Sequence, residues 1–352
     1  MTDTKRFFTD CLLTWNRLHN SRSMPWKGEK NPYKIWLSEI ILQQTRVEQG
    51  WPYYERFITN YPVVEKLAAA PEEEVFRLWQ GLGYYARCKN MLAAAREIAG
   101  KHKGAFPNTY EGITSLKGVG AYTAAAIASF AFNLPHAVLD GNVYRVLARF
   151  FGIDTPTDTT AGKKLFTQLA QEVLAKDQPA TYNQAIMDFG AVVCKPQQPL
   201  CTACPLASRC EAHQKGLTDL VPVKSKKLVI KKRFFHYLLL EQQDHVYIRK
   251  RTEKDIWQNL HEFILLETPA PANDTDLLQS PACRRLLGKH RYRIVGSTAE
   301  IKQQLTHQTI HARFIRLSVG AAFPAPDGFQ PVATTQLKKY AFPKIIVDYL
   351  QR

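Results

Sequence analysis

The spacing of apolar residues predicts that the N-terminal part of the chain is helical. In IWLSEIILQQT, which begins at Ile35, apolar residues recur at helical intervals and continue to Val47. Glu39 is the only acid between Glu29 and Glu48. A carboxyl facing a protein core is hard to ionise, whereas a single Glu is ordinarily a solvated charge on the outer face of a helix. This stretch alone leaves both interpretations open.

Two further segments place small or acidic residues at predicted helix starts. In LKGVGAYTAAAIASF, Gly118 and Gly120 flank a turn before a helix that begins near Ala121. Backbone N–H groups at such a start can bind a DNA phosphate, although an ordinary corner between helices has the same pattern. In VLDGNVYRVLARF, Asp140 precedes Gly141 at a candidate helix start, where it can be an N-cap residue or a functional carboxylate.

The pattern changes after about residue 215. Six Lys or Arg residues lie between Lys224 and Arg233 without helical periodicity. They predict a basic linker that follows a DNA backbone, although such a charge run is ordinarily just solvated. Strand-like alternation of β-branched and aromatic residues follows in RFFHYLLLEQQDHVYIRKR, KDIWQNLHEFILLE and QQLTHQTIHARFIRLSV. We therefore expect a small α+β domain of about 120 residues after the linker.

Composition narrows the choice of partner. The chain has 352 residues, 45% of them hydrophobic, which is enough for two domains with cores of their own. It carries 47 Lys and Arg against 31 Asp and Glu, a formal charge of +16, so a polyanion such as nucleic acid is the expected partner. Neither a signal peptide nor a membrane-spanning apolar run is recognisable, and we expect an intracellular protein in which cysteines bind metal rather than form disulfides.

Four of the seven cysteines are close together in CKPQQPLCTACPLASRC. They are separated by six, two and five residues and are Cys194, Cys201, Cys204 and Cys210. Four thiolates in one short loop can close around a tetrahedral zinc ion or a cubane iron–sulfur cluster. Zinc sites usually pair two tight Cys-x-x-Cys motifs, and only one is present, so the spacing favours a cluster. The remaining cysteines, Cys11, Cys88 and Cys283, are scattered singly.

The order of five motifs resembles that of the helix-hairpin-helix DNA glycosylases with an iron–sulfur cluster. The motifs are the helix with Glu39, GLGYYARCKN, the glycine hairpin, LDGNVYRVLAR and the four-cysteine loop. Among these glycosylases, the closest resemblance is to the MutY adenine glycosylases, and it covers roughly residues 5 to 225. It implies an all-α glycosylase module with a [4Fe-4S] cluster loop, followed by an α+β Nudix-like domain. The expected boundaries are 1–216 for the helical domain, with a six-helix part at about 26–130 and a cluster part at about 1–25 plus 131–216, then 217–232 for the linker and 233–352 for the Nudix-like domain.

The resemblance also suggests the chemistry. Relatives of endonuclease III carry a lysine nucleophile two residues after the last hairpin glycine, where this chain has Tyr122, so no Schiff base can form. The expected activity is therefore monofunctional removal of adenine opposite 8-oxoguanine, and opposite guanine, in base excision repair. Glu39, kept protonated by burial, would be the general acid and then activate water, while Asp140 at a helix N-terminus would stay ionised and stabilise or trap the sugar cation. By resemblance, Tyr122 and Asn142 contact the reacting nucleotide and Asp140.

Other residues are implicated in DNA contact by the same resemblance. Gln44 and Tyr84 match the family's intercalating wedge, although a tyrosine there is ordinarily a core aromatic. Leu305, Thr306 and His307 match a Phe-Ser-His loop that reads the oxidised guanine, with the aromatic side chain lost. The Nudix catalytic signature, an Arg-Glu followed by paired glutamates, is absent from the sequence, so the C-terminal domain is expected to bind and not to hydrolyse pyrophosphates.

Three other functions fit the sequence less well. A bifunctional endonuclease III-like glycosylase and lyase would need a lysine in place of Tyr122, and a non-catalytic iron–sulfur DNA-binding protein would need neither Glu39 nor Asp140. A Nudix hydrolase with a helical appendage lacks its glutamates. The expected partner is double-stranded DNA with an adenine:8-oxoguanine mispair, and no membrane. We further expect a monomer in the cytoplasm, on the nucleoid if the source is bacterial.

Overall fold

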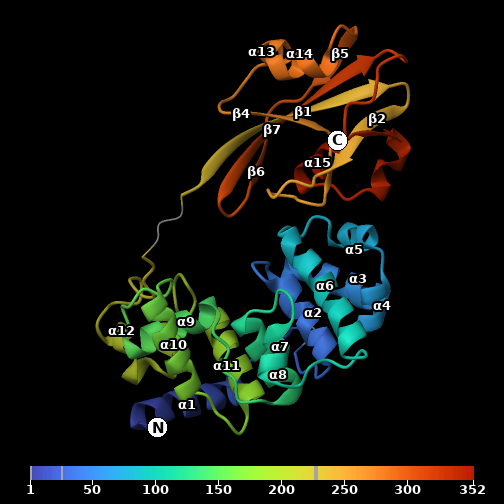
Figure 1. Cartoon of the computed structure of the whole chain (residues 1–352). Coiled ribbons are helices and arrows are strands. Elements are labelled where there is room, and N and C mark those ends of the chain that lie inside the picture. The colour runs from blue at the N-terminus through green and yellow to red at the C-terminus, as the bar shows by residue number, and fades with distance from the viewer. Residues whose placement is uncertain (1, 25–26, 226–228) are drawn as a thin grey trace. The chain divides into compact units, whose positions relative to one another are not determined.

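The computed structural model describes residues 2–24, 27–225 and 229–352, and the chain divides into two compact units. The first unit is Met1–Ala69 with Asn90–Lys227, and the second is Ala70–Lys89 with Leu228–Arg352, each taken over its described residues. The first unit is helical, and the strands that the structure describes all belong to the second (Figure 1). Residues 226–228 of the expected linker and the expected boundary between residues 25 and 26 lie outside the described residues.

The helices of the first unit are α1 (Asp3–His19), α2 (Pro32–Leu42), α3 (Val47–Asn60), α4 (Val64–Ala69), α7 (Tyr110–Ser115), α8 (Ala121–Phe132), α9 (Gly141–Phe151), α10 (Thr160–Glu172), α11 (Pro179–Val192) and α12 (Glu211–Gln214), together with most of α6 (Tyr85–Lys101). None of the helices in the described part of the chain is both long and apolar enough to cross a bilayer.

Helix α2 starts and ends at identifiable residues. Its N-cap Asn31 accepts hydrogen bonds from two backbone N–H groups of the first turn, and Pro32 occupies the first helical position. The helix ends at Leu42, and Gln44 has a left-handed backbone with φ of 56°. The expectation that Val47 continues this helix is therefore wrong, because a left-handed residue breaks the helical path and Val47 begins α3.

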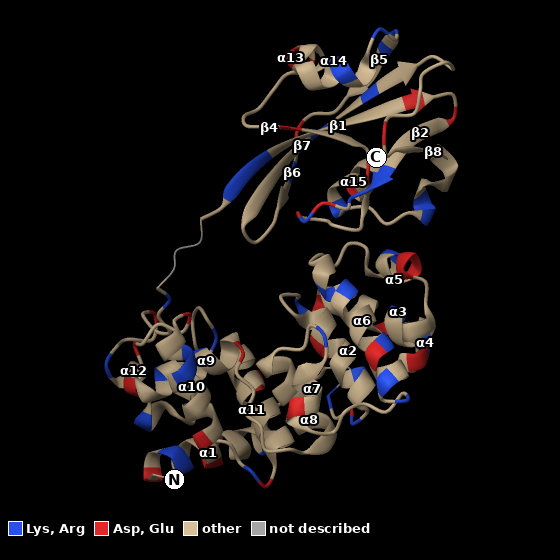
Figure 2. Ribbon diagram, in the orientation of Figure 1, with Lys and Arg blue, Asp and Glu red and all other residues tan. Residues whose placement is uncertain are grey.

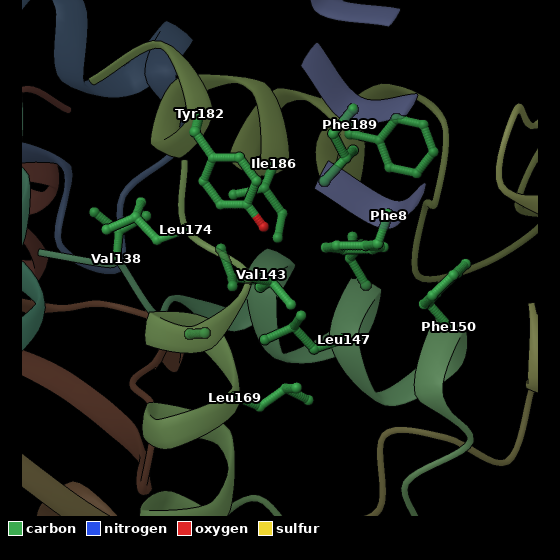
Figure 3. Close-up of a cluster of buried hydrophobic side chains, with 14 of the residues drawn as sticks. Phe8, Val138, Val143, Leu147, Phe150, Leu169, Leu174, Tyr182, Ile186 and Phe189 are labelled. Atoms are coloured by element: carbon green, nitrogen blue, oxygen red, sulfur yellow. The ribbon is translucent and has the colours of Figure 1, made fainter. Parts of the chain in front are cut away.

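A core of apolar side chains holds α1, α9 and α11 together. Each helix presents apolar residues at i, i+4 and i+7, so each has one apolar stripe. These residues are Phe8, Leu12 and Trp15 on α1, Val143, Leu147 and Phe150 on α9, and Tyr182, Ile186 and Phe189 on α11. Their side chains meet in one cluster (Figure 3), in which the rings of Phe8 and Phe150 are 4.8 Å apart. This packing fixes the start of α9, where Asp140 lies.

The second unit contains one sheet of eight strands. They are β1 (Lys231–Gln242), β2 (His245–Lys250), β3 (His261–Glu262), β4 (Ile264–Thr268), β5 (Tyr292–Ser297), β6 (Ile301–Gln304), β7 (Gln308–Val319) and β8 (Gln330–Ala333). The strand order is β3-β2-β1-β7-β5, with β4 also paired to β1, β6 to β7 and β8 to β2. β1 and β7 are parallel, and the other pairs are antiparallel.

Both faces of the central strand β1 are buried. Alternate residues point to opposite faces, so Phe235 and Tyr237 enter a core that includes the helix α15 (Lys344–Leu350), whereas Leu238 enters one that includes α13 (Asp274–Gln279) and α14 (Pro281–Leu287). Because both faces of β1 are buried, its sequence FFHYLLL is mostly apolar at consecutive positions and not only at alternate ones. The unit also includes α5 (Glu72–Trp79). The domain boundaries expected from the sequence stay predictions.

Candidate active site

Glu39 opens onto a cavity in the first unit. It is the only partly exposed residue between Ile35 and Ile41, and it borders a cavity of about 890 Å³. Five residues singled out from the sequence line this cavity, namely Glu39, Gln44, Tyr122, Asp140 and Asn142. The structure thus brings together side chains from α2, α8 and α9 that are up to 103 positions apart in the chain.

The cavity wall leaves the Glu39 carboxyl poorly solvated. Burial raises the pKa of Glu39 from 4.5 to about 7, a hydrogen bond from Tyr122 acts in the opposite direction, and the nearby Asp140 charge raises the pKa further. A carboxyl with a pKa near 7 is partly protonated at neutral pH, so Glu39 can donate a proton and later accept one.

Tyr122 holds Glu39 in position. It lies in the first turn of α8, whose run of alanines lets α2 pack closely on it. The Tyr122 hydroxyl hydrogen-bonds Glu39 and lies 3.6 Å from the sulfur of Met187 on α11. Burial and the Glu39 charge raise the pKa of Tyr122, so the phenol stays neutral and can act only as a hydrogen-bonding partner near neutral pH.

Asp140 is the N-cap of α9. One carboxylate oxygen accepts the Val143 backbone N–H at 2.8 Å, and the other accepts the Asn142 side-chain amide at 2.9 Å. We expected the helix terminus to dominate its ionisation, yet burial raises the pKa of Asp140, against these hydrogen bonds, which lower it. Because more donors reach Asp140 than Glu39, Glu39 is the carboxyl that keeps its proton to higher pH.

Arg145 connects Asp140 to the cysteine loop. Its guanidinium donates to the Asn142 side-chain oxygen at 2.7 Å, to the Cys194 carbonyl at 2.8 Å and to the Gly190 carbonyl at 2.7 Å. Asn142 therefore hydrogen-bonds Asp140 with its amide nitrogen and Arg145 with its oxygen. Sequence reasoning missed Arg145, because two of its acceptors, the Gly190 and Cys194 carbonyls, lie 45 and 49 residues away along the chain.

A buried carboxylate that sequence reasoning also missed fixes another wall of the cavity. Asp188 on α11 is fully buried and pairs with Arg22 at 2.8 Å and Lys27 at 3.1 Å. Gln184, one turn before it, donates to the same carboxylate. The signal available in the sequence was a single acid in the otherwise uncharged helix α11. Both cations line the cavity, so Asp188 ties the segment before α2 to its far wall.

The two hairpin glycines differ in what surrounds them. Gly118 has a left-handed backbone with φ of 78°, and a Cβ there would lie 2.6 Å from Cβ of Asn90. Gly120 is the N-cap of α8 and has no heavy atom within 4 Å of an added Cβ. The first glycine is therefore required by the turn, whereas the second leaves the N-terminus of α8 open to an anion.

Replacing each glycine by serine tests this difference. Gly118→Ser should lower the free energy of unfolding by about 1 kcal/mol or more, through strain and the clash with Asn90. Gly120→Ser should change it by less than about 0.5 kcal/mol, because serine is a good N-cap residue. Urea denaturation measures both values. Equal losses in the two variants would show that the turn does not depend on Gly118.

The four cysteines surround a second, smaller cavity in the first unit. Cys194 follows α11, Cys201 begins the 3₁₀ helix η1 (Cys201–Ala203), Cys204 is its C-cap, and Cys210 is the N-cap of α12. All four line the cavity and all four are free thiols. Within the described residues, no group of three or more His, Cys, Asp and Glu is arranged to hold a single metal ion.

The two predicted wedge residues share an uncommon backbone. Gln44 and Tyr84 both have positive φ, 56° and 49° respectively, which few residues other than glycine adopt. Both side chains are exposed, 44% in the case of Tyr84, and the Arg87 guanidinium lies over the Tyr84 ring. The neighbouring Tyr85 is buried against Phe76, so only the first tyrosine of the pair is a surface residue.

Residues 305–307 form the turn between β6 and β7. The Leu305 backbone pairs with Gln308, and its side chain packs against the core on the α15 side of the sheet. Thr306 and His307 are exposed at the tip. Within the second unit the hydroxyls of Thr306 and Tyr84 are hydrogen-bond partners.

Comparison with known proteins identifies the class of both parts. Residues 37–172 match the HhH-GPD superfamily of base excision DNA repair proteins, and residues 236–352 match the NUDIX domain. The fold resembles the structure of a thermostable thymine-DNA glycosylase with a TM-score of 0.56 and 28% identity, over 60% of this chain and 97% of that one. The expected fold class, a helical glycosylase module followed by a strand-rich Nudix-like domain, is confirmed.

Relatives refine this class. The adenine DNA glycosylase of Buchnera aphidicola subsp. Baizongia pistaciae is 34% identical over 88% of this chain and 85% of its own length. The adenine DNA glycosylase of Mus musculus is 41% identical over 59% of this chain and 42% of its own length. The chain belongs to the adenine DNA glycosylase family, as the sequence motifs predicted.

Proposed function

We propose that the protein is a monofunctional DNA glycosylase that removes adenine opposite 8-oxoguanine or guanine in base excision repair. Membership of the adenine DNA glycosylase family supports adenine as the base removed. The observation that carries the mechanism is the pairing of Glu39 with Tyr122 beside Asp140 in one cavity. The specificity for the opposite base, the roles of individual residues and the cofactor are parts of this proposal.

Glu39 supplies the proton. Adenine is a poor leaving group as an anion, so protonation of the purine ring must accompany cleavage of its bond to the sugar. With its pKa near 7, Glu39 is protonated often enough to donate, and the carboxylate that remains can activate the attacking water. Tyr122 keeps the carboxyl in position through its hydrogen bond.

Asp140 stabilises the sugar. Departure of the base leaves an oxocarbenium ion, and a nearby carboxylate offsets its charge or bonds to it. Asn142 and the Val143 backbone N–H fix both oxygens of Asp140 and favour its ionised form. The two carboxyls thus divide the work of acid and cation stabiliser, because their hydrogen-bond partners differ.

The lyase alternative has less support. A bifunctional enzyme needs a free amine beside the sugar, and the hairpin position holds Tyr122. Two lysines line the cavity, but Lys27 is paired with Asp188, and Lys30 donates to the Phe130 carbonyl. A non-catalytic DNA-binding protein would have no use for a carboxyl that burial keeps partly protonated.

Duplexes with a single adenine opposite 8-oxoguanine, guanine or thymine test the activity. After incubation and alkali, strand cleavage should be fastest for the 8-oxoguanine duplex, slower for guanine and absent for thymine. Without alkali the strands should stay intact, and borohydride should trap no protein on DNA. Cleavage without alkali together with trapping would show a lyase instead, and intact adenine in all duplexes would contradict the proposal.

The C-terminal domain is proposed to read the opposite base. Oxidised guanine differs from guanine by a carbonyl and an added N–H, and Thr306 and His307 place a hydroxyl and an imidazole on an exposed turn. Of the described α-helices in residues 233–352, neither α13, α14 nor α15 contains a glutamate, so they offer none of the paired glutamates of Nudix hydrolases. We propose binding of 8-oxoguanine by this domain, without hydrolysis.

Thr306→Ala with His307→Ala should reduce the preference for 8-oxoguanine over guanine as the opposite base. A hydrogen bond to a base edge is worth about 1 to 3 kcal/mol, roughly a ten- to hundredfold effect on the ratio of excision rates. The rate on the guanine mispair should change little, because Glu39 and Asp140 are untouched. An unchanged ratio would show that the turn does not read the lesion; Thr309→Ala, on the adjacent strand, is the matched control.

The four-cysteine cavity is proposed to hold a [4Fe-4S] cluster. Each iron of a cubane takes one thiolate, so four thiols that face one cavity from a short loop match its ligand set. Among the described residues, no carboxylate lines this cavity. When bound, the cluster would cross-link the loop between Cys194 and Cys210. The residues proposed for base excision, Glu39, Tyr122 and Asp140, need no step at the cluster.

Iron analysis tests the cofactor. Protein purified without oxygen should contain about four irons per chain, and Cys201→Ser should lower the iron content and the DNA affinity together. Cys11→Ser, a partly exposed cysteine outside the loop, should change neither. Stoichiometric zinc in place of iron would contradict the cluster.

DNA is the proposed partner of the whole chain. The formal charge of +16 favours a polyanion, and the basic start of β1, Lys231–Arg233, is visible in Figure 2. The domain boundaries are also part of the proposal. They are 1–216 for the helical domain, with parts at about 26–130 and at about 1–25 plus 131–216, then 217–232 for the linker and 233–352 for the Nudix-like domain. We also propose that the protein acts as a monomer in the cytoplasm, on the nucleoid if bacterial.

A further inference from the structure

A buried arginine beside the four-cysteine cavity forms no ion pair with an acidic side chain in the described part of the chain. Arg149 on α9 is 3% exposed and lines this cavity. Among the described residues it forms no ion pair with an Asp or Glu side chain, although burying an unpaired guanidinium is costly. Arg145, one turn earlier, reaches Asp140 through Asn142, so the charge of Arg145 has a carboxylate nearby.

The donors of Arg149 converge on the cysteine loop. Nη1 lies 3.5 Å from Sγ of Cys194 and 2.7 Å from the Lys195 carbonyl, and Nη2 lies 3.0 Å from the Pro196 carbonyl. Nε donates to the Val221 carbonyl at 3.2 Å, beyond the far end of the loop. The guanidinium thus fixes the turn that follows the first cysteine to the segment that follows the last.

The backbone of the same residue reaches another cysteine. Sγ of Cys210 lies 3.4 Å from the carbonyl oxygen of Arg149. One residue therefore contacts the first and the fourth cysteine of the loop, which lie on opposite sides of the sequence motif. A buried cation in this place suits an anionic occupant, since four thiolates with an iron–sulfur core carry net negative charge.

We propose that Arg149 is a positioning residue of the four-cysteine site, which supplies the buried positive charge that balances an iron–sulfur cluster and donates a hydrogen bond to the Cys194 thiolate. This inference rests on the cluster proposed above. The carbonyl groups that accept hydrogen bonds from Arg149 are neutral, so they do not balance its positive charge. An anionic cluster would balance it. Hydrogen bonds to cluster sulfurs and nearby charge also set the reduction potential, so the potential reports the role directly.

Arg209 offers a matched control. It lies in the same loop, just before Cys210, but its side chain is 44% exposed, pairs with Asp3 at 2.6 Å and covers the ring of Phe7. Its replacement removes an arginine of equal size and charge from the loop without removing a buried cation or a contact to a cysteine sulfur.

The experiment measures iron release and reduction potential in Arg149→Met, Arg149→Lys and Arg209→Met. With an excess of an iron chelator, Arg149→Met should lose iron at least about tenfold faster than the wild type, and its cluster should have a lower potential. Arg149→Lys, which keeps the charge but not the planar set of donors, should release iron at an intermediate rate. Arg209→Met should stay within about twofold of the wild type in release rate.

Each result has a distinct meaning. Suppose that the wild type contains about four irons and that Arg149→Met matches Arg209→Met in iron release and in reduction potential. This result would overturn the inference about Arg149 and leave the proposed cluster standing. Wild type without iron would overturn the cluster and this inference together. If Arg149→Met does not fold, Arg149→Lys decides, because iron release as slow as in Arg209→Met would show that the hydrogen bonds of Arg149 do not protect the site.

Discussion

Glu39→Gln is expected to lower the single-turnover rate of adenine excision by about a hundred- to ten-thousandfold while binding to the mispaired duplex survives. Glutamine has the shape of glutamate and can still accept the Tyr122 hydrogen bond, but it cannot deliver a proton to the purine ring. Glu48→Gln is the matched control, because Glu48 lines the same cavity with an exposed side chain. A Glu39→Gln rate within tenfold of wild type would end the assignment of Glu39 as the acid.

The raised pKa of Glu39 adds a pH dependence to this prediction. Only the protonated carboxyl donates, so wild-type excision should fall as the pH rises through about 7, provided that chemistry is measured in single turnover. The residual activity of Glu39→Gln should lack this fall. A wild-type rate that stays flat between pH 6 and pH 8.5 would contradict the acid role even if the substitution were damaging.

The same carboxyl should cost stability. Its pKa is higher in the folded state, about 7, than the ordinary value of 4.5, so the folded protein holds a proton that the unfolded chain releases. Stability is therefore unaffected below pH 4.5, falls as the pH rises from 4.5 to 7, and stays lowered above that. Glu39→Gln cannot ionise, so at pH 8 it should exceed the wild type in unfolding free energy by up to about 3 kcal/mol. A loss of unfolding free energy at a single carboxyl is typical of residues retained for function, which agrees with a catalytic role of Glu39.

Much of this arrangement could be predicted from local sequence. Glu39 stood out as an acid in an apolar helix, Asp140 as a residue before a helix start, and the cysteines by their intervals. Each of these signals lies within a few residues, where periodicity and capping rules apply. The order of the motifs then identified the family, which comparison with relatives confirmed.

The features that sequence reasoning missed depend on distant partners. Arg145, Arg149 and Asp188 are charged residues on helices whose apolar stripes predict only burial, and their partners follow from how α1, α9 and α11 pack. The helix of Glu39 was predicted too long, because nothing in the sequence marks Gln44 as left-handed. The burial that raises the pKa of Asp140 could not be predicted, since a capping position was visible in the sequence and its burial was not.

The second large effect is expected for Asp140→Asn. Asparagine is as good an N-cap as aspartate, so the Val143 N–H keeps an acceptor and α9 should start at the same residue. What is lost is the negative charge opposite the developing sugar cation. Removing one electrostatic contact of this kind typically costs a hundred- to a thousandfold in rate, and we expect single-turnover excision to fall by about that factor.

Asp188→Asn distinguishes this effect from the general loss of a buried carboxylate. Asp188 is buried near the same cavity, but its charge is balanced by Arg22 and Lys27, so its replacement leaves two cations without their partner. That variant should lose about 3 kcal/mol or more of unfolding free energy. Asp140→Asn, which leaves no ion pair broken, should lose much less stability and far more rate. The outcome against this role is that the rate loss of Asp140→Asn, relative to its loss of unfolding free energy, is no larger than in Asp188→Asn. Asp140 would then serve to cap α9, and its charge would not stabilise the transition state.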